Sequence, residues 1–298
     1  MKLLLFLLTL SFNVFAVNNP ITITSADNGK TFDGAGQVIS NTAGNCISIT
    51  GATNVTLRNY RIEHCSGVAI DIRGNSKNVT ISNASLYDTG GIYALFSEGI
   101  NVIESHISKV TGTAGAVHRN CIQFDHVTNV TISSNIIGNE CINDLGDSAR
   151  EDGINIYQSY GTASFPINII DNKVYGYSGT SSGGGIVVGD WGGAYINVIN
   201  NNVINTGVAG IAVAGGNHIF VGHNFVRLDQ SPVSQLGIKA VSMSPGTDCN
   251  NITLIDNNVM AKNSSGGQAD TWADSTTCFQ ATDNSKNVNN LNQGNNLW

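Results

Sequence analysis

The sequence has little charge, little proline and few apolar stretches of any length. Charged residues make up 12% of the 298 residues, and only 4 residues are proline. There is no run of lysine or arginine, and the net charge is −7, which argues against nucleic acid and anionic membrane surfaces as partners. The composition is otherwise balanced, and the length suffices for one large domain with a buried core.

The one strongly apolar stretch lies at the N-terminus. Lys2 precedes an apolar run from Leu3 to Leu10, and a small residue, Ala16, ends a candidate cleavage site. The run is too short to span a bilayer, and the whole pattern is typical of a secretory signal. We therefore expect residues 1–16 to be a signal peptide and residues 17–298 to form a secreted or periplasmic protein. No membrane insertion is expected after the signal is removed.

The six cysteines are not spaced as metal ligands. None belongs to a C-x-x-C pair, which argues against a zinc site. In an exported protein, six cysteines are typical of a disulfide framework, although many connectivities are open. Proximity in the sequence suggests the pairs Cys46–Cys65, Cys121–Cys141 and Cys249–Cys278. The pair Cys121–Cys141 would hold a long insertion beside the polar residues described below.

What the chain does contain is a repeated pattern of alternating apolar residues. The phrase Asn-Val-Thr followed by Leu or Ile begins at Asn54, Asn78 and Asn129, and Asn-Ile-Thr-Leu begins at Asn251. A second phrase, apolar-x-apolar, begins at Ile47, Ile70, Ala94, Ile122, Ile154, Ile186, Ile211 and Ile238. The alternation predicts short strands, and no segment has a helical period. The 34 glycines and many asparagines supply the turns, because both tolerate positive φ.

Such a unit cannot bury its apolar face alone, but stacked units build a continuous core. Two or three short strands in each unit fit a parallel β-helix. Asparagine recurs at one aligned position, where an inward column bonded to the backbone of neighbouring coils would explain it: Asn135, Asn172, Asn201, Asn224 and Asn257. We expect an all-β, single-domain solenoid of about eight coils, with an irregular tail from about residue 262.

These phrases carry a resemblance to a known family. The patterns Asn-Val-Thr-Ile-x-x-Asn and Gly-Ile-x-Val, from about Thr31 to Ala261, resemble right-handed parallel β-helix proteins of the pectate-lyase-like superfamily. The resemblance implies a right-handed coil. It also implies a polysaccharide as partner, acted on by a lyase, a hydrolase or an epimerase, or bound by a non-catalytic surface protein. Ca²⁺ is a candidate cofactor, as in many members of the superfamily.

Polar side chains gather on the consecutive coils that begin at Ile122, Ile154 and Ile186. In a stacked solenoid, equivalent outward positions form columns, and these coils place on one face Gln123, Asp125, His126, Asn155, Tyr157, Gln158 and Asp190. The segments that enter the coils add His118, Arg119, Arg150, Glu151 and Asp152. Trp191 follows Asp190, and aromatic rings stack well on the apolar faces of sugars.

This cluster predicts chemistry on an acidic polysaccharide. A uronate lyase must neutralise the carboxylate, remove the C5 proton with a base and protonate the leaving oxygen. We expect Arg150 or Arg119 to bind the carboxylate as a fork, and His118 or His126 to be the base. The predicted catalytic set is His118, Arg150, Tyr157 and Asp152. The predicted substrate-binding set is Arg119, Gln123, Asp125, His126, Glu151, Asn155, Asp190 and Trp191.

Other assignments of the same residues stay open. Asp125, Glu151, Asp152 and Asp190 are alternative ligands for Ca²⁺. Asp152 and Asp190 also suit the acid and base of an inverting glycoside hydrolase, because Glu-Asp-Gly-Ile-Asn-Ile faintly resembles a strand of polygalacturonases. The other hydrolase motifs are missing. A uronan epimerase shares the lyase machinery, a glycan binder needs no base, and a purely structural role would have both aspartates cap turns. We expect a monomeric polysaccharide lyase.

Overall fold

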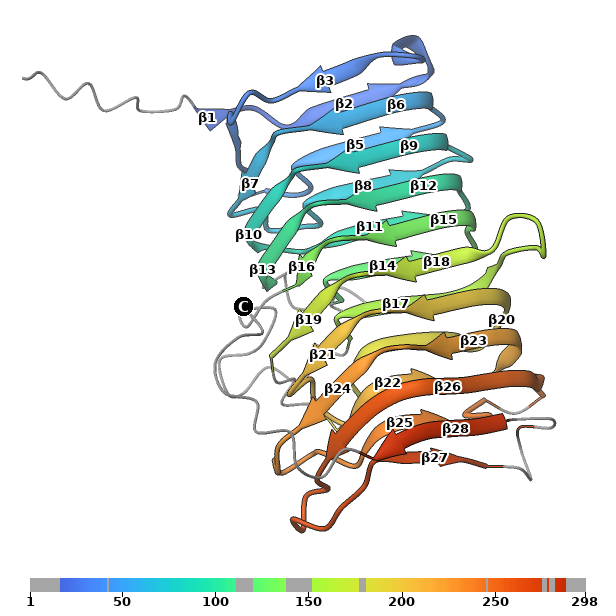
Figure 1. Ribbon diagram of the computed structural model, residues 1–298. Helices are drawn as coiled ribbons and strands as arrows, with labels where there is room; N and C mark the ends of the chain where they lie inside the picture. The colour runs from blue at the N-terminus through green and yellow to red at the C-terminus, as the bar shows by residue number, and fades with distance from the viewer. Residues whose placement is uncertain are drawn as a thin grey trace, which may run out of the picture.

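The structure is a computed structural model that describes residues 17–41, 43–110, 120–137, 152–176, 181–244, 246–274, 278 and 282–287. Within these residues, short strands stack coil on coil into one elongated parallel β-helix (Figure 1). The pairings between named strands are parallel, and each joins strands of neighbouring coils. No helix in the described part of the chain is long and apolar enough to cross a membrane. The expected all-β solenoid is therefore confirmed.

The first ladder carries the apolar-x-apolar phrases. Its strands are β2 (Ile21–Thr24), β5 (Ile47–Thr50), β8 (Ile70–Arg73), β11 (Ile92–Leu95), β14 (Ile122–Asp125), β17 (Ile154–Tyr160), the first part of β20 (Gly184–Ile199), β22 (Ala209–Val213), β25 (Leu236–Ala240) and β27 (Thr271–Ala273). Strands β2 and β27 extend the ladder by one coil at each end, beyond the repeat visible in the sequence. The predicted solenoid of about eight coils is confirmed, with one further strand at each end of this ladder.

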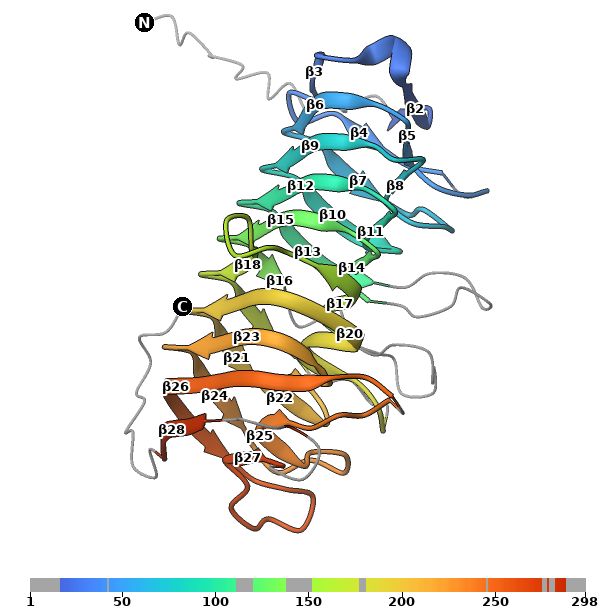
Figure 2. The ribbon, with the colours of Figure 1, turned by 90° about the vertical axis from the view of Figure 1, so that its right-hand side faces the viewer.

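Two further ladders complete each coil (Figure 2). The second contains β3 (Thr31–Asp33), β6 (Thr53–Arg58), β9 (Lys77–Ser82), β12 (Glu98–Ile103), β15 (Thr128–Ser133), β18 (Ile167–Ile170), the end of β20, β23 (Gly216–Gly222), β26 (Cys249–Ala261) and β28 (Thr282–Asn287). The third contains β1 (Val17–Asn18), β4 (Val38–Ile39), β7 (Arg61–Glu63), β10 (Ser85–Thr89), β13 (His106–Val110), β16 (Ile136–Ile137), β19 (Lys173–Tyr175), β21 (Asn202–Ile204), β24 (Phe225–Leu228) and the end of β26. Strands β27 and β28 both follow residue 262, where the predicted irregular tail begins.

An isoleucine column fills the first ladder from the inside. Strand register aligns Ile21, Ile47, Ile70, Ile92, Ile122, Ile154, Ile186, Ile211 and Ile238. The phrase predicted to begin at Ala94 therefore begins two residues earlier, at Ile92, and Tyr93 rather than Leu95 pairs with Gln123. The cause of the error is that both positions continue the same alternation, Ile-Tyr-Ala-Leu, so a period of two cannot select the register.

The predicted asparagine column is confirmed on the inside of the solenoid. Asn135, Asn172, Asn201, Asn224 and Asn257 are all at most 1% exposed. Each Nδ2 donates to the Oδ1 of the next asparagine, at 2.9 to 3.0 Å, until the column ends at Asn257. Each Nδ2 also donates to a carbonyl of the preceding coil. These bonds satisfy the buried amides and fix the stacking of successive coils.

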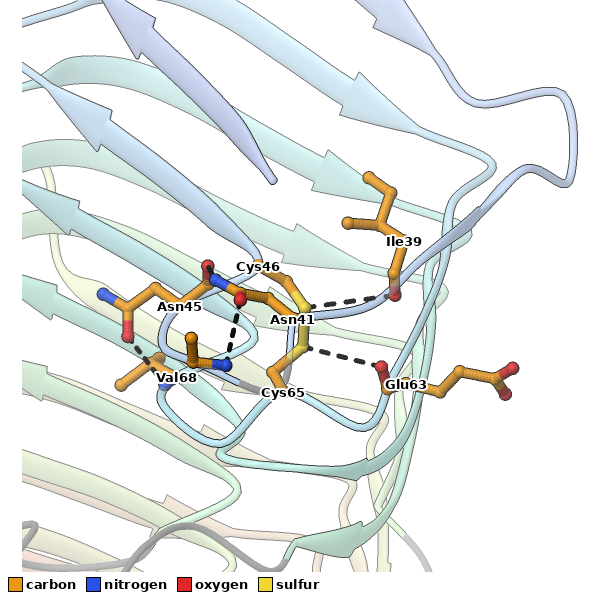
Figure 3. The surroundings of a disulfide bond; sticks show 8 residues. Ile39, Asn41, Asn45, Cys46, Glu63, Cys65 and Val68 are labelled. Atoms are coloured by element: carbon orange, nitrogen blue, oxygen red, sulfur yellow. Dashed lines mark hydrogen bonds between the residues drawn. A yellow bond between two sulfur atoms is a disulfide. The ribbon is translucent and has the colours of Figure 1, made fainter. Parts of the chain in front are cut away.

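Two of the three predicted disulfides are confirmed. Cys46 is bonded to Cys65 and Cys249 to Cys278. Figure 3 shows the first one between the turn before β5 and the turn after β7, beside Ile39 and Glu63. In the same turn, Asn45 Oδ1 accepts the Val68 N–H at 2.9 Å. The third predicted pair includes Cys141, which lies outside the described residues, and it stays a prediction.

Removing the first disulfide is expected to destabilise the fold without changing the site. The bond joins residues 19 positions apart, and both sulfur-bearing side chains are buried. In the chain-entropy model, a loop of this size contributes about 3 kcal/mol. We expect Cys46→Ala/Cys65→Ala to unfold at a lower urea concentration, with activity per folded molecule retained. An unchanged unfolding midpoint would contradict this, and wild-type protein treated with a reductant is the matched control.

Candidate active site

Among the described residues, the outside of the first ladder carries Gln123, Asp125, Asn155, Tyr157 and Asp190. Register places Gln123 beside Asn155, and Asp125 beside Tyr157, on β14 and β17. Asp190 pairs with Tyr157 rather than with Gln158, because the register shifts there and Gly189 is the extra residue of β20. Gly189 has φ of 69°, and a Cβ on it would lie 2.2 Å from the Gly215 carbonyl oxygen, so the bulge requires glycine. This bulge corrects the predicted alignment.

Asp125 and His126 form a contact pair at the end of β14. His126 has φ of 52°, and its Nδ1 lies within hydrogen-bond distance of Asp125 Oδ1. The Phe96 ring lies 4.8 Å from the His126 ring, and the Tyr157 ring lies 6.4 Å from it, centroid to centroid. The imidazole is 40% exposed, so one ring nitrogen is held by a carboxylate while the ring remains accessible. This arrangement suits a residue that accepts a proton.

Tyr157 is held in its protonated form at neutral pH. Partial burial and the negative charges of Asp125 and Asp190 raise the pKa of its hydroxyl. A raised pKa keeps the O–H available as a hydrogen-bond and proton donor. Tyr157 and His126 therefore place a hydrogen-bond donor and an acceptor on neighbouring coils.

Tyr93 and Arg73 extend the site toward the N-terminus, and the sequence analysis missed both. The Tyr93 hydroxyl contacts Asp125 Oδ2 at 3.3 Å, and burial together with the Asp125 charge raises the pKa of Tyr93 to about 12. Arg73 lies 5.1 Å above the Tyr93 ring and is bound by Asp71. Alignment of Ile92 with Ile122 would have placed Tyr93 beside Gln123 on the polar face. The phrase was instead taken to begin at Ala94, so Tyr93 was not recognised.

Asn155 connects two carboxylates. Its Nδ2 donates to Asp152 Oδ2 at 2.7 Å and to Asp190 Oδ2 at 3.3 Å. Asp152 is 7% exposed, and its Oδ1 accepts the Gly184 N–H at 2.8 Å. Oδ1 of Asp152 thus links to the next coil, whereas Oδ2 is held by Asn155 of its own coil. This is the turn-capping role, which leaves the predicted catalytic role of Asp152 without support from the geometry.

The described residues do not form a calcium site among themselves. Within the described residues, no three histidine, cysteine, aspartate or glutamate side chains lie close enough to hold a metal ion. The amide of Asn155 turns its nitrogen, rather than its oxygen, to Asp152 and Asp190. A cation between the two carboxylates would need an oxygen at that place. The donor set of these residues therefore does not fit Ca²⁺.

A hollow lies on the same face, further along the solenoid. It has a volume of about 130 Å³ and extends from Asp152 and Asp190 to Lys239. Lys239 lies on β25 beside Ala212 of β22. Burial lowers the pKa of the Lys239 ammonium, and the Asp152 charge opposes this shift. The sequence places Lys239 at an aligned outward position of the ladder. It was not predicted as a site residue, because its neighbours on the ladder, such as Ala212, are small and apolar and do not mark a polar cluster.

Trp191 lies beside the polar face, at the end of the bulge. Its φ is 54° and the side chain is 51% exposed, so the ring is available to a sugar. Tyr160 of β17 is also exposed, and its hydroxyl would lie 3.1 Å from a Cβ placed on Gly192. Trp191 and Tyr160 therefore lie on adjacent strands, β20 and β17, beside the polar face. His118, Arg119, Arg150 and Glu151 lie outside the described residues, so their predicted roles stay predictions.

Comparisons with known proteins give the fold a family context. A family model described as a right-handed beta helix region matches residues 21–226. A search of curated proteins found no match. One similar solved structure is the A-module of a mannuronan C-5 epimerase from Azotobacter vinelandii, with a TM-score of 0.55 and 13% identity. The alignment covers 84% of this chain and 71% of the epimerase module.

A second similar structure is a periplasmic alginate epimerase, determined as a double mutant. Its TM-score is 0.50 and its identity 13%, over 82% of this chain and 62% of the epimerase chain. This chain therefore spans less than two thirds of that protein. At such identities the similarity concerns the fold, and the right-handed family agrees with the hand expected from the sequence.

Proposed function

The chain belongs to the right-handed β-helix family, and from this premise we propose that it is a carbohydrate-active enzyme, a lyase of an acidic polysaccharide. The observation that carries the proposal is the group formed by Asp125, His126 and Tyr157. It brings an accessible imidazole oriented by a carboxylate close to a protonated phenol. The two similar structures are named as epimerases of mannuronan and alginate, and both names agree with a uronate-containing substrate.

In the proposed reaction, His126 removes the C5 proton of a uronate. Asp125, in contact with Nδ1, orients the ring and stabilises the imidazolium that forms. The electron pair of the C5–H bond forms the C4–C5 double bond, and the C4–O4 bond breaks. Tyr157, which is protonated at neutral pH, donates its proton to O4 of the leaving sugar. Arg150 and Arg119, known from the sequence alone, remain the proposed ligands of the substrate carboxylate.

The second candidate is an epimerase, because proton removal from C5 begins both reactions. An epimerase returns a proton to the opposite face of C5 and leaves O4 bonded. The hydrolase is less well supported, since Asp152 and Asp190 share one amide proton donor and Asp152 caps the Gly184 turn. A glycan binder would use the same face without turnover. Each of these functions gives a different product.

The test is incubation with a panel of uronate and neutral polysaccharides, followed by four measurements. The proposal predicts new ultraviolet absorbance from unsaturated uronates, together with new reducing ends. Reducing ends without that absorbance would indicate a hydrolase, and exchange of C5 hydrogen with deuterated solvent without chain cleavage would indicate an epimerase. Retention on a glycan column with no product at all would indicate a binder. Each of the last three outcomes would overturn the lyase assignment.

A further inference from the structure

Planar side chains occupy one turn position on four consecutive coils, at the end of the first ladder. Each directly follows a residue of the outward row that contains Asp125 and Tyr157. We call this set the planar column, and its members are Phe96, His126, Gln158 and Trp191. All four have φ between 41° and 54°, so the four turns share one backbone conformation. On the two preceding coils the same place is taken by Gly51 and Gly74, with φ of 64° and 67°.

Neither turn geometry nor core packing accounts for the two aromatic ends of the planar column. Glycine adopts the left-handed conformation without strain, whereas a side chain such as phenylalanine or tryptophan adopts it at a cost of about 1 to 3 kcal/mol. The rings do not recover this cost by burial, since Phe96 is 54% and Trp191 is 51% exposed. Two large apolar rings held in solvent beside a polar face indicate a surface that contacts a ligand.

The shape of the planar column suits a sugar chain better than a protein. The column is one side chain wide, and Asp125 and Tyr157 border it on the ladder side. A stable protein partner needs about 800 Å² of surface, far more than a single row of side chains offers. A pyranose ring instead has an apolar face of C–H groups for the rings and a polar edge of hydroxyls for the border. The ligand that fits both parts is therefore a carbohydrate chain.

The spacing of the coils matches the spacing of sugars in such a chain. Strands β11, β14, β17 and β20 follow one another along the solenoid axis (Figure 1). Phe96 and Trp191 are three strands apart, which is about 14 Å along the axis. An extended 1,4-linked pyranose chain advances by nearly one strand spacing for each sugar. Four consecutive sugars therefore match the four coils of the planar column.

We propose that Phe96 and Trp191 are stacking platforms for the first and fourth sugars of a chain bound along the solenoid axis. The two central sugars then face His126 and Tyr157, on β14 and β17. The direction of the chain rests on the proposed function. His126 acts on C5 of one central sugar, and Tyr157 protonates O4 of the other as it leaves. The reducing side of the chain therefore extends to Phe96, and the non-reducing side extends to Trp191.

Binding is tested apart from catalysis with 1,4-linked oligomannuronates and oligogalacturonates of two and four sugars, in a His126→Ala background. Adding Phe96→Ala or Trp191→Ala is expected to weaken the tetrasaccharide of at least one series about fivefold to tenfold and leave its disaccharide unchanged. Phe96→Tyr should keep the affinity. The matched control is Trp272→Ala, which removes a ring 47% exposed on β27, at the far end of the same ladder, and should also keep it.

The inference is wrong if neither tetrasaccharide binds, if both folded variants keep the full affinity, or if Trp272→Ala weakens binding as much as they do.

The two products of cleavage test the direction of the chain. The unsaturated product contains the sugar placed at Phe96, so Phe96→Ala should weaken its binding and Trp191→Ala should not. The saturated product should respond in the opposite way, and the reverse assignment of either product would overturn the proposed direction. Should both variants weaken the tetrasaccharide while no polymer yields unsaturated product, the lyase proposal fails and the two platforms stand.

Discussion

Asn201→Ala is expected to lower the free energy of unfolding by about 4 kcal/mol, because it opens the middle of the asparagine column. Asn201 Nδ2 donates to the carbonyl oxygens of Ile169 and Ile199, and its Oδ1 accepts from the backbone and side chain of Asn172. Alanine leaves these buried groups without partners, and each one costs about 1 to 3 kcal/mol. The measurement is urea denaturation followed by circular dichroism.

The matched control is Asn197→Ala, four residues earlier on β20. Asn197 also donates an amide hydrogen bond to an asparagine of the preceding coil, Asn168, at 3.0 Å. It faces outward and is only partly buried, so water can replace the lost bond. We expect a loss of about 1 kcal/mol or less. Similar losses for the two variants would mean that the column contributes little beyond ordinary surface hydrogen bonding.

The Asn201 variant also separates the scaffold from the chemistry. The column lies inside the coil, at the turn before the third ladder, whereas the polar face lies outside the first ladder. Protein that remains folded should therefore turn over substrate at close to the wild-type rate. This combination, low stability with normal turnover, is the opposite of what we expect from changes at the polar face.

The repeat made much of this fold predictable from the sequence. Alternating residues with asparagine and glycine turns indicate stacked strands, and the asparagine column follows from one aligned position. The end strand β27 was missed because its unit keeps only part of the phrase, as in Thr271-Trp272-Ala273, whereas β2 keeps the alternation in Ile21-Thr22-Ile23 but was not counted with the repeat. End units have one free side, so the same residue pattern is not required of them.

The site was only partly predictable, because it depends on register. Gln123, Asp125, Asn155 and Tyr157 were placed correctly since three consecutive isoleucine phrases align without gaps. Asp190 was predicted beside Gln158, but the bulge at Gly189 places it beside Tyr157. Tyr93 was not predicted, because the alternation in Ile-Tyr-Ala-Leu fits two registers. A slip of one or two residues in a strand changes which side chains are neighbours while leaving the composition unchanged. Only the paired strands reveal such slips.

The hollow illustrates a different limit. Its floor consists of small apolar residues, Ala209 and Ala212 among them, that resemble ordinary turn or strand positions in the sequence. What makes them the floor of a hollow is the absence of bulk between Asp152 and Lys239, which are 87 positions apart in the chain. Sequence patterns indicate which side chains are present, whereas a cavity depends on which volumes are left empty by distant ones.

His126→Ala is expected to lower turnover by about 10² to 10⁴-fold on the uronate polymer that the wild type cleaves. The reason is that His126 is the proposed base, held by Asp125 and close to Tyr157. Binding of the same polymer should change much less, because proton transfer is a transition-state interaction. Initial rates of unsaturated product and equilibrium binding, measured on the same preparation, separate the two effects.

The chain offers a close control for this change in His218. Its Nδ1 contacts the preceding residue, Asn217, at 2.9 Å, its φ is 53°, and its ring stacks on Tyr195 at 4.7 Å. It shares the local geometry of His126 but lies on β23, in the second ladder, with an amide in place of the carboxylate. We expect His218→Ala to keep wild-type turnover. If His126→Ala also does so, the base is another residue, and the sequence-based candidate His118 becomes the first to test.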